Sequence, residues 1–356
     1  MIVAIFVGMS FGLLVVFGYR LTPLLFSRRN IKLSFSPNEL RTGEIVIVIL
    51  AMAIKLIVPN SMIDFLASAD VSLSSPFIMT EEHIARYQIA IGKRSSKITE
   101  VSPLHQLLFL SAITEPAMLI LLSSPACPVN PLGAVNVRNR FELLRPDLCV
   151  PSAFKNFGQA TLLTNVHTNP RHVKRGVEFD IEITLRIQDQ TSIGGTILIY
   201  RQIFTMLEFR RIKQQDVHVT SHRGLHDDAF GFSNAAQISF NTNDPLKWAA
   251  LSKDYNFIHL SSAAAKAFGL PGKLAHGNHA IARALQNIQI PTHGNTRAWM
   301  EVDFRRPMSI PGEFDVILTN VDAASTGFAV AKAEKIYVTA RYGVLGKTER
   351  CVTFEL

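Results

Sequence analysis

The segment Leu251-Ser-Lys-Asp-Tyr-Asn-Phe-Ile-His-Leu260, in the last third of the chain, decides how the rest of the sequence is interpreted. It places a carboxylate, a carboxamide and an imidazole within six residues, at Asp254, Asn256 and His259. Side chains held this close together can fix one water between a proton acceptor and a proton donor. Asp-x-Asn is also common in turns, because both side chains bond to nearby backbone. The segment is therefore a candidate catalytic loop whose meaning depends on its surroundings.

Two further motifs follow this loop. An alanine-rich segment leads to Leu274-Ala-His-Gly277, and then to Glu301-Val-Asp-Phe-Arg-Arg-Pro-Met-Ser-Ile-Pro-Gly312. In this order the motifs resemble those of the MaoC-like (R)-specific enoyl-CoA hydratases, which have the hotdog fold. The match departs in two places. The family's Gly-Asp-x-Asn-Pro reads Lys-Asp-Tyr-Asn-Phe here, and Asn278 stands where an apolar residue is usual. Neither change removes a functional group from the loop.

The resemblance implies a role for each motif residue. Asp254 and His259 would bind one water between them. One of the pair accepts its proton while the oxygen adds to the β-carbon, and the other delivers a proton to the α-carbon on the same face. Asn256 would orient the substrate or the pair, and the backbone N–H of Gly277 would face the thioester carbonyl. The expected contacts to the carrier's phosphates are Arg305, Arg306 and Lys273.

The expected reaction interconverts a trans-2-enoyl thioester and an (R)-3-hydroxyacyl thioester by syn addition of water. Coenzyme A or acyl carrier protein would be the substrate carrier, and no cofactor is expected. A hotdog thioesterase is an alternative, but it requires a carboxylate on the helix, where this chain has Asn278 and His279. A non-catalytic acyl-thioester-binding protein is a second alternative, although retention of all three loop residues argues against it.

The histidines leave a metal site as a further interpretation. His276 and His279 are three residues apart, and with His259 or Asp254 they could bind a metal ion. No other Cys, His or carboxylate lies at ligand spacing, so no metal is predicted. The remaining residues of note are expected to be structural or solvated histidines (His105, His218, His222 and His226) and core tryptophans (Trp248 and Trp299).

A coarse internal repeat indicates the fold class. The chain has 356 residues, enough for two linked domains. A short helix, a long helix and then strands are expected twice, and several strand segments alternate apolar and polar residues. The expected segments are 80–91, 103–122 and strands from 134 in the first copy, 244–251, 276–288 and strands from 297 in the second, and alternating strands at 177–187, 196–206 and 329–342. This pattern predicts an α+β double hotdog, with two antiparallel sheets each wrapped around a central helix.

The repeat also gives domain limits. Residues 1–75 are expected to be a hydrophobic anchor and linker, 76–228 a non-catalytic N-terminal hotdog, and 229–356 the catalytic MaoC-like hotdog. The loop of the first copy, Gly92 to Glu100, contains no histidine. One active site per chain is therefore expected. The two copies would form an internal pseudo-dimer, and a further homodimer is left open.

The N-terminus predicts membrane attachment. Met1 to Tyr19 contain no charged side chain, and the apolar character continues to Phe26. This length is close to the ~20 residues that cross a bilayer. A secretory signal would need a positively charged start and a small-residue cleavage site, and neither is evident. The basic residues that follow, Arg20, Arg28, Arg29, Lys32 and Arg41, place the catalytic region in the cytoplasm by the positive-inside rule.

A second apolar stretch, Ile45 to Val58, is interrupted by Lys55 and ends before Pro59. Because it is short for a span, we expect an interfacial or partly buried helix. Residues 61–75 would then be a linker.

Composition excludes some classes of function. The net charge is +8, but no Lys/Arg stripe interleaved with aromatic residues is present, so a nucleic-acid partner is not expected. Three widely spaced cysteines, Cys127, Cys149 and Cys351, give no disulfide framework and suit a reducing compartment.

Overall fold

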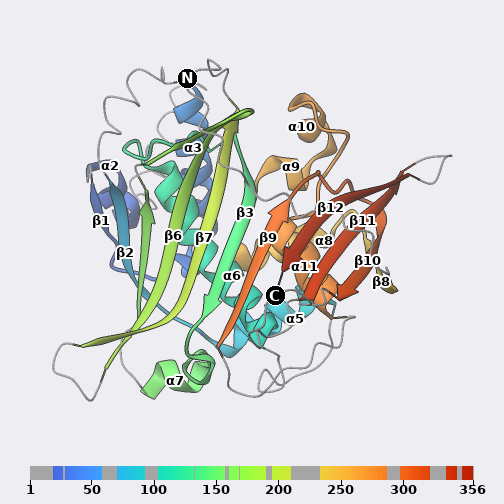
Figure 1. Ribbon diagram of the computed structural model, residues 1–356. Helices are drawn as coiled ribbons and strands as arrows, with labels where there is room; N and C mark the ends of the chain where they lie inside the picture. The colour runs from blue at the N-terminus through green and yellow to red at the C-terminus, as the bar shows by residue number, and fades with distance from the viewer. Residues whose placement is uncertain are drawn as a thin grey trace. The chain divides into compact units, whose positions relative to one another are not determined.

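The computed structural model describes residues 19–26, 29–57, 70–92, 103–131, 133–156, 160–167, 169–189, 195–209, 233–286, 297–320, 334–342 and 347–355. Its chain divides into two compact units (Figure 1). Unit 1 comprises Met1–Met79, Ile113–Asn136 and Pro151–His218, and unit 2 comprises Thr80–Ala112, Val137–Val150 and Val219–Leu356. The units are interleaved along the chain, whereas the predicted limits at 75/76 and 228/229 follow chain order.

Unit 1 is built on a mainly antiparallel sheet in the order β1-β2-β4-β6-β7. Only β1 and β2 are parallel, and the short β5 pairs with the start of β6. Its strands are β1 (Asn30–Lys32), β2 (Val71–Phe77), β4 (Ala160–Val166), β5 (Arg171–Val173), β6 (Gly176–Gln188) and β7 (Thr196–Phe209). Its helices are η1 (Tyr19–Leu21), α2 (Thr22–Phe26), η2 (Pro37–Glu39), α3 (Thr42–Ile57), α7 (Pro151–Asn156) and the second half of α6 (Pro103–Ser123).

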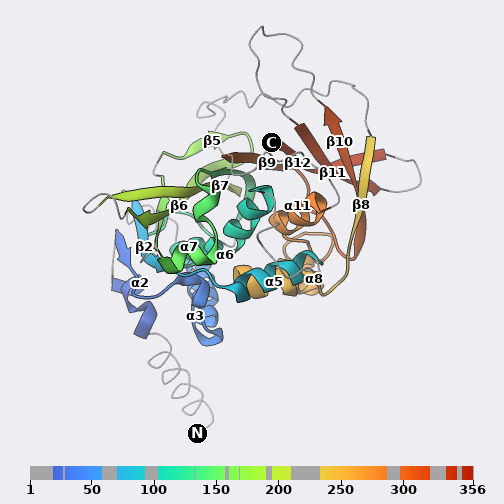
Figure 2. The ribbon, with the colours of Figure 1, turned by 90° about the horizontal axis from the view of Figure 1, so that it is seen from below.

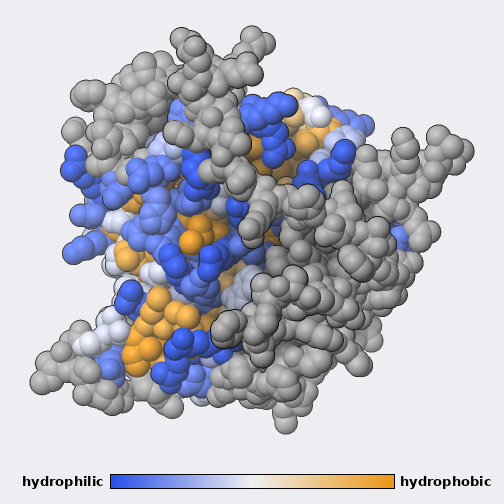
Figure 3. Space-filling view, in the orientation of Figure 1, coloured by the Kyte–Doolittle hydropathy of each residue, from blue (hydrophilic) through white to orange (hydrophobic). Residues whose placement is uncertain are grey.

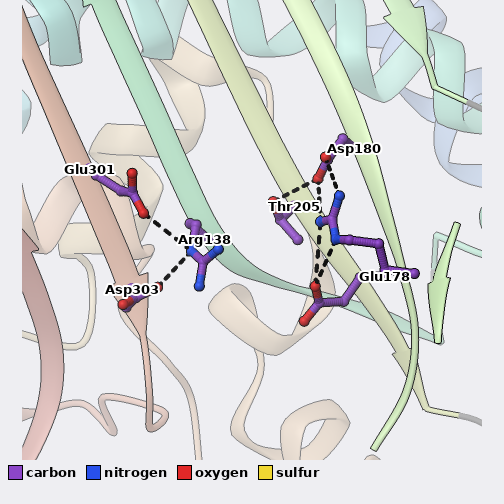
Figure 4. Close-up of polar contacts among 7 residues, drawn as sticks. Arg138, Glu178, Asp180, Thr205, Glu301 and Asp303 are labelled. Carbon is purple, nitrogen blue, oxygen red and sulfur yellow. Dashed lines mark hydrogen bonds and ion pairs between the residues drawn. The ribbon is translucent and has the colours of Figure 1, made fainter. Parts of the chain in front are cut away.

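The two faces of this sheet differ because strand residues alternate in direction. On β6, Ile181, Ile183 and Leu185 are fully buried. On the other face, Asp180 accepts hydrogen bonds from Arg171 and Thr205 (Figure 4). Hydrophilic side chains predominate over this unit on the side seen in Figure 3, with smaller hydrophobic patches between them. The alternation predicted for 177–187 is therefore confirmed.

Unit 2 contains an antiparallel sheet in the order β3-β9-β12-β11-β10-β8. Its strands are β3 (Ala134–Leu143, of which the first three residues count with unit 1), β8 (Ser233–Phe240), β9 (Ala298–Phe304), β10 (Gly312–Asn320), β11 (Glu334–Tyr342) and β12 (Lys347–Glu355). Its helices are α5 (Glu81–Ile91), the first half of α6, η4 (Pro146–Leu148), α8 (Asp244–Ser252), α9 (Phe257–Leu260), α10 (Ser262–Ala267) and α11 (Gly277–Leu285).

Helix α11 is buried in unit 2 and fixes the position of the motif that precedes it. His279 is fully buried, its ring stacks on Trp248 at 5.0 Å, and its Nε2–H donates to the carbonyl of Ala90 at 2.8 Å. Burial lowers the pKa of His279 to about 3, so the ring is neutral. Arg283 pairs with Asp244 of α8 at 2.8 Å. These contacts hold the start of α11 against α5 and α8.

Several sequence expectations are corrected. Val71–Phe77 forms strand β2, with Val71, Leu73 and Phe77 buried, where a linker was predicted up to residue 75. Trp248 is buried as expected, but Trp299 is 46% exposed, because its side chain lies on the outward face of β9. The apolar stretch around Lys55 is a helix, as predicted.

The predicted membrane anchor is Met1 to Phe26, of which Met1 to Gly18 lie outside the described residues. Residues 93–100 of the first-copy loop and residues 210–228, at the end of the predicted N-terminal hotdog, lie outside them too. In the part of the chain that the structure describes, α6 alone has the length and apolar composition of a membrane span, and 89% of its apolar window is buried within the protein. This burial is also what the core helix of a globular domain shows.

Candidate active site

The loop after α8 presents the carboxylate of Asp254. Helix α8 ends at Ser252, and Lys253 takes a left-handed conformation with φ 57° that turns the chain. The backbone N–H of Asn256 then donates to Asp254 Oδ1 at 3.2 Å. Because this bond occupies one carboxylate oxygen, Oδ2 is the oxygen that faces the imidazoles.

Asn256 shapes the loop through its side chain as well. Its Oδ1 accepts the N–H of Ile258 at 3.3 Å and so caps α9. A cap of this kind satisfies a backbone donor that the helix leaves unpaired. The backbone N–H of Asn256 thus holds Asp254. Its side chain holds the first turn of α9, which carries His259.

His259 directs its second ring nitrogen toward Asp254. Its Nδ1 lies 3.0 Å from the carbonyl oxygen of Leu274, which can only accept, so Nδ1 carries the hydrogen. In the neutral ring Nε2 therefore holds a lone pair, and it lies 4.0 Å from Asp254 Oδ2. Burial lowers the pKa of His259, although the Asp254 carboxylate acts in the opposite direction. The ring is thus a neutral proton acceptor near pH 7.

His276 completes the cluster, whereas the sequence interpretation gave it no part in positioning Asp254 and His259. Its Nε2–H donates to the backbone carbonyl of Asp254 at 3.1 Å and lies 3.6 Å from Asp254 Oδ2. Its ring stacks on His259 with centroids 3.8 Å apart. Burial, followed by the neighbouring His259, holds the pKa of His276 well below its usual range. A neutral His276 therefore positions both members of the pair.

Gly277 has no room for a side chain. A Cβ at this position would lie 2.3 Å from the ring of Phe304, which ends β9. As the first residue of α11, Gly277 carries a backbone N–H with no partner within the helix. The N-terminus of the helix also favours negative charge. Gly277 therefore supplies a donor suited to an oxyanion.

The three predicted phosphate contacts differ in exposure. Arg305 and Arg306 are exposed directly after β9. Lys273 is only 8% exposed, and its Nζ donates to the carbonyl of Thr242 at 3.0 Å. A role for Lys273 would require it to leave this carbonyl.

The site also contains a donor set that a divalent cation can use. Asp254, His259 and His276 each offer one ligand atom, and these atoms lie within 4.8 Å of one another. His279, which the sequence interpretation considered as a ligand, instead bonds to Ala90. Two imidazoles and one carboxylate can bind zinc, so the cluster fits a metal ion in its chemistry. The Nδ1 of His276 has no hydrogen-bond partner among the described residues.

Comparisons with known proteins bear on the family resemblance and on the fold. Residues 222–344 match the sequence profile described as "MaoC like domain". HtdX of Mycobacterium tuberculosis is 19% identical, with a TM-score of 0.57 over 81% of this chain and 98% of that chain. A MaoC-like dehydratase from Phytophthora capsici is 15% identical, with a TM-score of 0.51 over 83% of this chain and 97% of that chain. No curated protein sequence matches. The family resemblance and the hotdog fold class predicted from the motifs are confirmed.

Proposed function

We propose, from the MaoC-like domain that residues 222–344 form, that this protein is an acyl-thioester hydro-lyase. It would interconvert trans-2-enoyl and (R)-3-hydroxyacyl thioesters carried on coenzyme A or acyl carrier protein. The observation that carries the proposal is the convergence of Asp254 Oδ2 and His259 Nε2 at 4.0 Å, with both side chains only partly exposed.

This spacing suits one bridging water. A water can donate one hydrogen to each of two acceptors 4.0 Å apart, which leaves its lone pairs directed away from both. Those lone pairs are the electrons that attack the β-carbon of an enoyl thioester. The neutral His259 and the Asp254 carboxylate thus form a base that activates water without a metal.

Hydration returns to the substrate the proton that the water gives up. One O–H bond of the water breaks and its proton passes to the pair, while the oxygen bonds to the β-carbon. The π electrons move toward the thioester carbonyl, whose oxygen becomes negative. The pair then returns a proton to the α-carbon, on the face from which the water came. Dehydration is the same sequence in reverse.

The backbone N–H of Gly277 is the proposed partner of the carbonyl oxygen. Charge grows on this oxygen as the enolate forms, so a fixed donor stabilises the transition state more than the substrate. A donor of this kind contributes ~3 kcal/mol in other enzymes.

The start of α11 favours this reaction over a thioesterase. A thioesterase of this fold would need a carboxylate there, but the next residues are Asn278 and His279, both buried. Asn278 accepts from Asn139 at 2.8 Å and donates to Ser111 at 3.1 Å. Neither side chain is available to attack an acyl group.

Attachment to the membrane through Met1 to Phe26, with the catalytic region in the cytoplasm, is part of the proposal. Support comes from the uncharged start of the chain and the basic residues that follow it. Arg305 and Arg306 are the proposed contacts to carrier phosphates, because both are exposed beside the site.

Enoyl-CoAs of graded chain length test the reaction. Loss of enoyl absorbance and formation of (R)-3-hydroxyacyl-CoA are expected from purified full-length protein. Release of free thiol without hydration would favour the thioesterase. The variant His167→Ala is a matched control, because this exposed histidine of unit 1 should leave the rate unchanged.

A further inference from the structure

Helix α3 has its charges on the inside and its apolar side chains on the outside. Its sequence contains two charged residues, Glu44 and Lys55, which are 1% and 4% exposed. Val46, Leu50 and Ile54 are 49%, 56% and 60% exposed. Residues four apart lie on one face of a helix, so these three form one outward apolar stripe. A helix on the surface of a soluble domain has the opposite arrangement.

The two buried charges hold this orientation. Glu44 accepts from Arg20 at 2.9 Å and from the backbone N–H of Arg41 at 2.8 Å. Lys55 Nζ lies 2.9–3.1 Å from four backbone carbonyls that follow or end α6, those of Leu122, Ser124, Cys127 and Val129. If α3 rotated to bury its stripe, Lys55 would leave all four carbonyls. Removing a buried charge from its partners is strongly unfavourable, so the stripe stays outward.

Exposed basic side chains precede this helix in the chain. Arg29, Lys32 and Arg41 are exposed, and Arg41 directly precedes α3. In Figure 2, α3 lies at the periphery of unit 1, with α6 and α7 on its inner side. An outward aliphatic stripe that follows exposed positive charges matches the chemistry of an anionic bilayer surface, which offers acyl chains below a layer of negative headgroups.

We propose that the outward face of α3 lies on an anionic membrane surface. Val46, Leu50 and Ile54 enter the boundary between headgroups and acyl chains, and Arg29, Lys32 and Arg41 contact the headgroups. A second copy of the chain is the less suitable occupant. Three side chains on one helix expose far less than the ~800 Å² per partner that stable dimers bury, and two copies would bring like charges together. The proposal is independent of the hydratase activity, because α3 contributes no residue to the candidate site.

A fluorescent label on the stripe tests this placement. The full-length variant Leu50→Cys, with Cys351 replaced by Ser, is labelled with a polarity-sensitive dye, since Cys127 and Cys149 are buried. The matched control is Ile89→Cys on α5, since Ile89 is 60% exposed and Leu50 is 56% exposed. Both are mixed with phosphatidylglycerol/phosphatidylcholine vesicles that contain a lipid with a nitroxide on its acyl chain.

The label at position 50 is expected to shift its emission to the blue and to be quenched at least twofold, while the label at position 89 stays unquenched. The quenching should weaken when phosphatidylglycerol is omitted. A label at position 50 that remains unquenched would overturn the proposal. Two other results would also overturn it. In one, Leu50→Cys forms a disulfide between two copies, so the stripe faces a second copy. In the other, the label at position 50 is already shielded without lipid by another part of the chain.

Discussion

The proposed base for water activation depends on which nitrogen of His259 carries the hydrogen. The carbonyl of Leu274 holds the hydrogen on Nδ1 and leaves the lone pair on Nε2, facing Asp254. The loop sequence predicted that Asp254 and His259 lie together, because they are only five positions apart in the chain. It did not predict that His276 bonds to the backbone of Asp254, since that contact spans 22 residues. The one sign of this contact in the sequence was the histidine of the Ala-His-Gly motif, His276.

Removal of either member of the pair should abolish most of the activity. Asp254→Asn and His259→Ala are each expected to lower kcat by several orders of magnitude with little effect on thermal unfolding. Because both act on one water, the double variant should be scarcely slower than either single variant. Steady-state hydration rates and circular dichroism check this. Near-normal hydration by either single variant would contradict the assignment of Asp254 and His259 as the catalytic pair.

The pH dependence follows from the protonation state of His259. Its folded-state pKa is lowered by burial, so the neutral form persists as pH falls through 6.5, the ordinary value. Activity is lost only when pH falls through the lowered pKa and the lone pair on Nε2 is protonated. We expect the acidic limb of the kcat/KM profile to have its midpoint below 6.5. A profile in which activity instead falls as pH rises through this range would show that the charged imidazole is the active form.

At the scale of elements, short-range hydrogen bonds of Asp254 and Asn256 shape the loop after α8. Such bonds are expected from the Asp-x-Asn sequence. The helices at 244–251, 80–91 and 103–122 were predicted within one or two residues. The first two keep one apolar face, whereas the third is apolar on nearly all sides and is mostly buried. Strand β2 was missed. Its alternation is carried by Val71, Leu73 and Phe77, but serines and Pro76 lie between them, and its antiparallel partner β4 lies some 90 residues later.

The contact between Gly277 and Phe304 couples α11 to β9. Gly277→Ala should place a methyl group 2.3 Å from the ring, push the start of the helix away and lower kcat by roughly 10- to 100-fold. Phe304→Ala in the same chain makes room for the methyl group and should restore part of the loss. Rates of the two single variants and the double variant test this. An unchanged kcat in Gly277→Ala would show that close approach is not needed there.

At the scale of the whole molecule, the repeat and the alternation of strands predicted the fold class. They did not predict that Thr80–Ala112 belongs with the C-terminal half. That grouping depends on contacts such as α5 with α8 and Ser111 with Asn278, which join residues more than 150 positions apart. Hydrophobic periodicity shows which face of an element is buried, but not which element covers it.

The grouping predicts how a truncated chain behaves. A fragment of residues 230–356 lacks β3, which pairs with β9, and α5, which packs on α8. It would expose the edge of β9 and the apolar face of α8, so it should be insoluble or inactive. Size-exclusion chromatography and the hydration assay check this against the full chain. A stable, active monomer would mean that the site does not need the earlier residues.

Asp254 and His259 are proposed to add one water to one face of an enoyl thioester. The most direct measurement is hydration of a trans-2-enoyl-CoA in D₂O, with the configuration of both carbons of the product determined by NMR. We predict (R)-3-hydroxyacyl-CoA carrying one deuterium at the α-carbon, on the same face as the new hydroxyl, and no such product from Asp254→Asn. A product with hydroxyl and deuterium on opposite faces, the (S) alcohol, or hydrolysis of the thioester alone would contradict the account.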